Sequence, residues 1–199
     1  MIPPMQPGLF PAHRQVLIED PEGGVSYRPA VIDAFDGGRW LESLLRQVPW
    51  QAQQRPMYDR VVAVPRLTAA YLLADPALPE ALAAAAGRLQ REVGVPFNAV
   101  GLNLYRDGRD SVAPHNDTLP GLVPGHPIAL LSLGATRRMI IRSKQPPRRS
   151  WQIDLEHGSL LLMSHDSQRH YEHGVPKTTQ PVGKRISLAF RVRPARLAE

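Results

Sequence analysis

Residues 97–105 read Phe97-Asn98-Ala99-Val100-Gly101-Leu102-Asn103-Leu104-Tyr105, and they open a series of short segments that turn residues separate. Apolar and β-branched residues alternate or cluster in each segment, and no helical pattern lies between them. The other segments are 128–133, 138–141, 151–155, 159–163 and 185–192. Six or more such strands predict a β-sandwich or barrel.

Two helices are expected ahead of these strands. Apolar residues follow helical spacing from about Gly38 to Val48, and the segment from Ala81 to Val93 is rich in alanine and leucine. Short strands are expected at 16–18 and 25–27, and residues 1–12, with four prolines, should form an extended arm. We therefore expect one domain that is mainly β with flanking helices (α+β), the helices buttressing its outside.

Composition limits the chemistry and the partners. The chain has 199 residues, of which 43% are hydrophobic, and a net charge of +6. It contains no cysteine, so any transition metal must be held by nitrogen and oxygen ligands. No apolar run approaches the roughly 18 to 20 residues that span a bilayer, and no signal peptide is recognisable. A cytoplasmic protein without membrane association is the expectation.

The candidate metal ligands are two histidines and one aspartate. His115-Asn116-Asp117 places an imidazole and a carboxylate two residues apart, so on a strand they share one face. His173 follows in Tyr171-Glu172-His173-Gly174-Val175-Pro176. Such a set holds a non-haem ferrous ion on one side and leaves the other side open. An H-x-D pattern alone also fits a surface pair, so the surrounding motifs decide between the two interpretations.

A cationic stretch lies in the sequence between Asp117 and His173, and two interpretations of it stay open. It comprises Arg137, Arg138, Arg142, Lys144, Arg148 and Arg149. The stretch forms either a solvated hairpin rim or an edge that contacts phosphates, because clustered cations gain affinity for nucleic acid by releasing counterions.

Further motifs surround the candidate ligands in a fixed order. They are Asn103-Leu104-Tyr105-Arg106-Asp107, Asp110-Ser111-Val112-Ala113-Pro114-His115-Asn116-Asp117, Ser132-Leu133-Gly134-Ala135-Thr136-Arg137, His157-Gly158-Ser159-Leu160-Leu161-Leu162-Met163, His173-Gly174-Val175-Pro176 and Arg185…Phe190-Arg191. This series closely resembles the AlkB family of Fe(II)- and 2-oxoglutarate-dependent oxidative dealkylases. Pro65-Arg66-Leu67-Thr68-Ala69-Ala70-Tyr71 is similar to the family's nucleotide-recognition lid. The likeness covers residues 60–194, which leaves 1–59 as an N-terminal extension that supports the lid within a single domain, 1–199.

The resemblance implies a double-stranded β-helix (jelly roll) and a set of site residues. The iron ligands, which are the catalytic residues, would be His115, Asp117 and His173. The groups that bind 2-oxoglutarate would be Asn103, Tyr105, Arg185, Ser187 and Arg191. The substrate contacts would be Tyr58, Arg66, Tyr71 and Leu119. With O2 as oxidant, such an enzyme removes alkyl groups from N-alkylated bases in DNA or RNA, releasing formaldehyde, succinate and CO2. Because a base inside a duplex is out of reach, the enzyme takes single strands or flips the nucleotide out.

Two departures from the family pattern concern substrate and co-substrate. Leu119 stands where family members that act on methylated bases carry an acidic residue, and this puts the nucleobase specificity in doubt. Ser187 and Ala189 replace the usual asparagine and threonine, which is a milder change because Ser187 still forms hydrogen bonds.

Three functions follow as candidates. Repair of alkylated single- or double-stranded nucleic acid by a monomeric enzyme comes first, favoured by the cationic stretch and the lid-like segment. The same oxygenase chemistry on a protein side chain or a small molecule is the alternative that Leu119 favours. A nucleic-acid-binding module without turnover is the third, and the intact ligand set with Arg185 argues against it.

Overall fold

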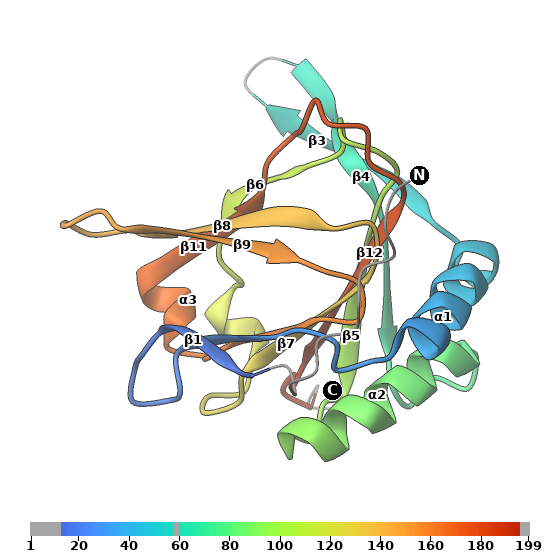
Figure 1. Cartoon of the computed structure of the whole chain (residues 1–199), viewed down its shortest axis with the longest axis horizontal. Helices are drawn as coiled ribbons and strands as arrows, with labels where there is room; N and C mark the ends of the chain where they lie inside the picture. The colour runs from blue at the N-terminus through green and yellow to red at the C-terminus, as the bar shows by residue number, and fades with distance from the viewer. Residues whose placement is uncertain (1–12, 58–59, 196–199) are drawn as a thin grey trace, which may run out of the picture.

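Two antiparallel β-sheets face each other in the computed structural model, which describes residues 13–57 and 60–195 and the side chains of these ranges except 55–63 (Figure 1). The large sheet has eight strands, in the order β1 (Gln15–Ile18), β2 (Val25–Arg28), β10 (Leu160–Met163), β7 (Ile128–Gly134), β12 (Arg185–Arg191), β5 (Ala99–Tyr105), β4 (Arg60–Leu72) and β3 (Gln51–Met57). The small sheet has four, in the order β6 (Val112–His115), β11 (Tyr171–Val175), β8 (Arg137–Ser143) and β9 (Ser150–Leu155). This is the jelly-roll arrangement that the sequence predicted. The expected arm over residues 1–12 lies outside the described residues.

Two helices cover the outer face of the large sheet, as expected (Figure 1). Helix α1 (Ala34–Gln47) begins earlier than the predicted Gly38, because the Asp33 side chain accepts a hydrogen bond from the Asp36 N–H and caps the helix. Helix α2 (Glu80–Val93) ends at Gly94, whose φ of 72° is the left-handed conformation that glycine adopts readily. Neither of these 14-residue helices, nor any other helix in the described ranges, has the length and apolar character of a bilayer span.

Strand alternation divides the interior into two cores. The outer core lies between the helices and the large sheet, and β12 contributes Ile186, Leu188 and Phe190 to it. The inner core lies between the two sheets and includes Met139, Ile141, Leu161 and Val175. Because successive side chains point to opposite faces of a strand, the residues between those of the outer core must face the space between the sheets. Polar residues at these positions form the site.

Candidate metal and co-substrate site

The three predicted metal ligands converge at one edge of the small sheet. The ligand atoms of His115, Asp117 and His173 all lie within 4.8 Å of one another. His115 ends β6 and pairs directly with His173 on β11, with ring centroids 4.5 Å apart. Asp117 comes from the loop after β6, so the loop rather than a shared strand face brings it to the histidines. Two imidazoles and one carboxylate so close together can hold one Fe(II) ion.

Each of the two imidazoles has a nitrogen atom placed to bind a cation. The Nδ1 of His115 lies 3.0 Å from the Ala113 carbonyl oxygen. A carbonyl only accepts, so Nδ1 carries the proton and Nε2 is left as the ligand atom. His173 is buried, and this burial together with the nearby His115 lowers its pKa to about 3. The His173 ring is therefore neutral and ready to bind a metal.

Asp117 is fixed by two residues that come from distant parts of the chain. Its backbone N–H donates to Oε1 of Gln168, 3.0 Å away, and its carboxylate accepts from Nε of Arg191. Burial alone would raise the pKa of the Asp117 carboxyl, but Arg191 and the two histidines outweigh burial and hold it below its usual value. A Cβ on Gly101 would come within 3.1 Å of Nη1 of Arg191, so the glycine leaves room for this arginine.

The predicted co-substrate residues come together on strands β5 and β12. In the register of these antiparallel strands, Arg185 pairs with Tyr105 and Ser187 pairs with Asn103. Cross-strand partners point to the same face, and their neighbours along each strand belong to the outer core. The four side chains therefore face the space between the sheets.

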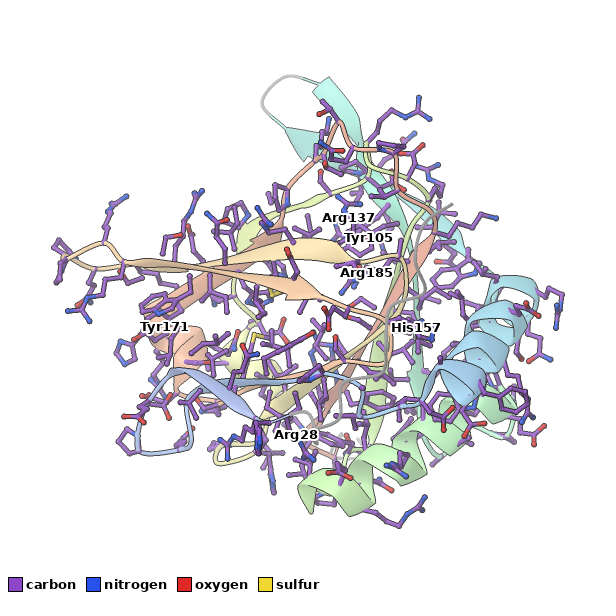
Figure 2. The ribbon with its side chains drawn as sticks, in the orientation of Figure 1. Arg28, Tyr105, Arg137, His157, Tyr171 and Arg185 are labelled. Atoms are coloured by element: carbon purple, nitrogen blue, oxygen red, sulfur yellow. The ribbon has the colours of Figure 1, made fainter. Side chains whose placement is uncertain are left out.

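Arg185 is a buried cation with unused hydrogen-bonding capacity. Its side chain is 0% exposed and donates one bond, from Nη2 to Oγ of Ser132 at 2.8 Å. Its Nε and Nη1 atoms find no partner among the described residues. Its guanidinium carbon lies 5.1 Å from the centre of the Tyr105 ring (Figure 2). Burial lowers the pKa of Arg185, and a carboxylate placed against the two unused donors would offset this unfavourable burial. The distal carboxylate of 2-oxoglutarate fits this requirement.

The predicted substrate contacts are dispersed. Arg66 lies on the inner face of β4, where its Nε donates to Oδ1 of Asn103 at 2.7 Å. Tyr71, on the same strand, packs against the outer core on the opposite face of the sheet from Arg66. Leu119 is half-buried in a short 3-10 turn, Leu119–Gly121, two residues beyond Asp117. Tyr58 lies outside the described residues.

The cationic stretch divides into buried and exposed members. Arg137 is 3% exposed, and exposed Arg138 forms an ion pair with Asp154. Half-buried Lys144 donates to the Gln168 carbonyl. Three members remain exposed near the tip of the β8–β9 hairpin, namely Arg142, Arg148 and Arg149. The stretch is therefore neither wholly a solvated rim nor wholly a contact edge.

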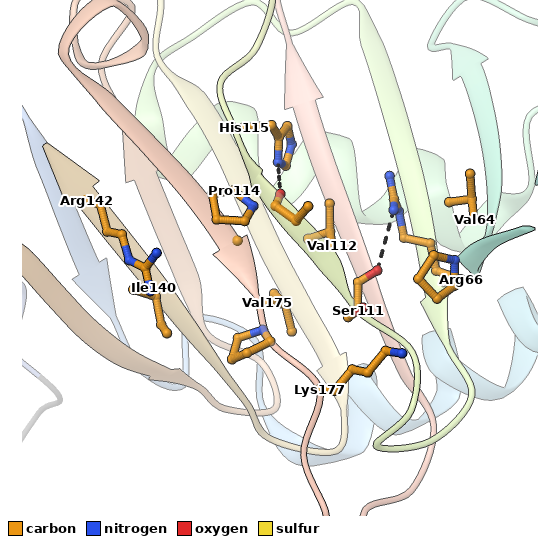
Figure 3. A pocket seen from close by; sticks show the side chains of 14 residues that line it. Val64, Arg66, Ser111, Val112, Pro114, His115, Ile140, Arg142, Val175 and Lys177 are labelled. Atoms are coloured by element: carbon orange, nitrogen blue, oxygen red, sulfur yellow. Dashed lines mark hydrogen bonds between the residues drawn. The ribbon is translucent and has the colours of Figure 1, made fainter. Parts of the chain in front are cut away.

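A cavity of about 530 Å³ adjoins the metal ligand His115 (Figure 3). It is lined by residues of β4, β6, β8 and β11 and by the segment after β11. Its apolar part includes Val112, Ile140 and Val175, and its cationic part consists of Arg66, Arg142 and Lys177. An apolar surface ringed by cations suits a flat, uncharged ring carried on an anionic chain.

The chain belongs to the 2OG-Fe(II) oxygenase superfamily, whose family model matches residues 71–191. Fe(II), 2-oxoglutarate and O2, the cofactors predicted from the sequence, are those of this superfamily. The chain is similar in fold to a prolyl hydroxylase from Trichoplax adhaerens, solved in complex with a hypoxia inducible factor peptide fragment. The TM-score is 0.62 at 13% identity, and the match covers 84% of this chain and 83% of the hydroxylase.

Relatives in sequence confirm the resemblance to AlkB proteins. Alpha-ketoglutarate-dependent dioxygenase alkB homolog 3 of Rattus norvegicus and that of Homo sapiens are each 33% identical over 82% of this chain. DNA oxidative demethylase ALKBH2 of Homo sapiens is 39% identical over 49% of this chain and 40% of the relative. The chain spans 62% and 64% of the two alkB homolog 3 proteins, less than two thirds of their length.

Sequence reasoning missed Gln168 and Ser132 as parts of the site. Both are buried, and each touches a predicted site residue from a distant strand or turn. Ser132 lay inside a quoted motif, and its register opposite Ser187 is the signal that strand pairing would have given. Gln168 lies in a polar segment between two histidines and carries no comparable signal.

Proposed function

We propose that this chain catalyses Fe(II)- and 2-oxoglutarate-dependent oxidative dealkylation of N-alkylated bases in DNA or RNA. The observation that carries the proposal is the pairing of two features in one interior: three convergent metal ligands, and the buried Arg185 with two unused donors. Two relatives support nucleic acid as the target: one is named a DNA oxidative demethylase and the other an alkB homolog. A monomeric state and a cytoplasmic location remain predictions from the sequence.

His115, Asp117 and His173 would hold the iron, and Arg185 with Ser132 would hold the distal carboxylate of 2-oxoglutarate. When both are bound, the centre supplies the oxidising power that hydroxylates an N-alkyl carbon, and the products are an aldehyde, succinate and CO2. Arg191 keeps Asp117 ionised and oriented, while Tyr105 and Ser187 line the space beside Arg185. Burial of Arg185 excludes water from the anchor, which strengthens its attraction for a carboxylate.

The cavity beside His115 is the proposed place of the target base. Its apolar part offers contact area for a ring, and its cationic members can meet flanking phosphates. The exposed Arg148 and Arg149 extend the positive charge along the β8–β9 hairpin. Together these cations favour an extended polyanion over an isolated small molecule.

Leu119 supports the alternative substrate class. Its half-buried aliphatic side chain, just past Asp117, offers no hydrogen bond to a base edge. The same oxygenase chemistry could then act on a protein side chain or a small molecule. A binding module without turnover is disfavoured. A buried arginine whose donor atoms lack partners among the described residues is unfavourable unless it binds an anionic ligand, and a module without turnover would not need 2-oxoglutarate.

The test is mass spectrometry of a panel of methylated oligonucleotides incubated with the protein, Fe(II), 2-oxoglutarate and oxygen. We expect loss of methyl mass from at least one lesion, with stoichiometric succinate, and no loss with Asp117→Ala. Succinate without loss of methyl mass from any oligonucleotide would favour the alternative substrate class. Absence of both products would refute the proposal.

A further inference from the structure

Arg137 begins strand β8, and its guanidinium is buried and forms hydrogen bonds within the protein. Its guanidinium donates to three backbone carbonyls: Nη1 to Asp107 at 2.9 Å, and Nη2 to Asp110 at 2.8 Å and to Pro176 at 2.7 Å. The side chain is only 3% exposed. A residue bound and buried in this way cannot contact a phosphate of a substrate, although it belongs to the cationic stretch.

The three carbonyls belong to the segments that lead into and out of the site. Asp107 and Asp110 lie between Tyr105, the last residue of β5, and the start of β6, which carries His115. Pro176 follows β11, which carries His173. The two segments also approach each other closely, since a Cβ on Gly108 would lie 2.4 Å from the Thr178 carbonyl oxygen. Arg137 therefore ties together the connections of three strands that build the site.

The same guanidinium lies against Tyr105. Its central carbon is 5.5 Å from the ring centre, and that of Arg185 is 5.1 Å from the same ring. In the view of Figure 2 the side chains follow one another in the order Arg137, Tyr105, Arg185. The positive charge of Arg137 adds to burial in lowering the pKa of Arg185. Two buried cations thus act at this end of the site, and one of them, Arg185, retains unused donors.

We propose that Arg137 is a positioning and specificity-determining residue for the dicarboxylic co-substrate, holding Tyr105 against Arg185 and adding a second buried positive charge. The inference rests on the proposed use of 2-oxoglutarate and assigns Arg137 a role in selecting a dianion over a monoanion. One buried charge within about 10 Å of a carboxylate changes its binding constant by roughly an order of magnitude. Arg137 itself need not touch the co-substrate. Its positive charge acts over a distance, and its contact with the Tyr105 ring holds that side chain in place.

The experiment compares two 2-oxo acids on the full chain loaded with Mn(II), by titration calorimetry without oxygen. The probes are 2-oxoglutarate and 2-oxopentanoate, which lacks the distal carboxylate. The quantity compared is the dissociation constant of 2-oxopentanoate divided by that of 2-oxoglutarate. We expect Arg137→Met to lower this ratio by about tenfold. Arg137→Lys, which keeps the charge, should stay within about threefold of the unaltered chain. The matched control is Arg138→Met, since this neighbour is exposed and paired with Asp154, and its ratio should not change.

A merely structural role for Arg137 would lower the melting temperature of Arg137→Met and leave the ratio unchanged, and that result would overturn the inference. If Arg137→Met shows no cooperative melt, Arg137→Gln replaces it, because an amide can still donate to the carbonyls without carrying charge. An unaltered chain that does not bind 2-oxoglutarate would instead overturn the proposed function and this inference with it.

Discussion

Replacing Arg185 by methionine should change the stability of the free protein little and weaken co-substrate binding strongly. Arg185 is a fully buried cation whose Nη2 donates to Ser132, while its Nε and Nη1 atoms have no partner among the residues that the structure describes. Methionine fills a similar volume without a charge. Replacing a buried ion by an apolar side chain is neutral or stabilising by about 1–4 kcal/mol, and leaving the Ser132 hydroxyl unpaired costs about 1–3 kcal/mol.

The net change in stability of the free protein is therefore between about −3 and +3 kcal/mol, a range centred on zero. A chain of this size shifts its melting temperature by roughly 2–4 °C per kcal/mol. Binding of 2-oxoglutarate should instead be clearly weakened. Removing one partner of a buried, hydrogen-bonded charge pair costs roughly 2–5 kcal/mol, which is about 30-fold to several-thousandfold in the dissociation constant.

Two measurements test this difference between the stability of the free protein and its affinity for 2-oxoglutarate. Calorimetric melting of the metal-free chain should give Arg185→Met a melting temperature close to that of the unaltered chain. Titration of the Mn(II)-loaded chain should show 2-oxoglutarate affinity reduced at least 30-fold. A variant that melts far lower and still binds 2-oxoglutarate normally would show that Arg185 is a structural residue with satisfied donors. The reasoning from its unused donors would then fail.

Three further outcomes are expected. Gln168→Ala removes the acceptor of the Asp117 N–H, so Fe(II) affinity measured by titration should fall about 10- to 100-fold while the fold is retained. Asp110 has its pKa lowered by hydrogen bonds from Arg106, so its contribution to unfolding free energy is present above pH 3.8 and is lost as pH falls below that value; Asp110→Asn should flatten this acid limb in urea titrations. Replacing Arg148 and Arg149 together by alanine should reduce the slope of log affinity against log salt for an oligonucleotide by about 2, and an unchanged slope would remove the hairpin from the interface.

The resemblance to AlkB proteins supplied the predicted co-substrate residues, and strand alternation explains why those on β12 share one face. Arg185, Ser187 and Arg191 are spaced by even numbers of residues, and the residues between them are apolar. On a strand this pattern puts polar groups on one face and the outer core on the other, which the structure shows for β12. Helix α1 was less predictable, because its start depends on the Asp33 cap rather than on apolar spacing.

The same rule explains why Tyr71 and Arg66 lie on opposite faces of the large sheet. Arg66 and Tyr71 are five residues apart on one strand, and an odd spacing places their side chains on opposite faces. Because Arg66 points to Asn103, Tyr71 must point to the helices, and it packs there. The sequence comparison interpreted residues 65–71 as a lid, for which strand alternation predicts no facing. In the structure these residues belong to β4, which pairs with β5 in the large sheet.

Arg137 shows what a local sequence pattern does not contain. Its neighbours in sequence are cationic, so charge counting groups it with Arg142, Arg148 and Arg149. Its burial depends on carbonyls between 27 and 39 residues away, which become close only when the two sheets assemble. The contact of Gln168 with Asp117, across 51 residues, is hidden for the same reason.

The difference between a predictable reaction and an open substrate follows from burial. Arg185 and His173, predicted to bind 2-oxoglutarate and iron, are both buried, so their polar atoms must find partners, and this requirement restricts what the two residues can do. The cations around the cavity, such as Arg142 and Lys177, are exposed, so burial does not restrict their partners in this way. Their positions are compatible with several anionic partners, so affinity for methylated oligonucleotides, and not further geometry, decides the substrate.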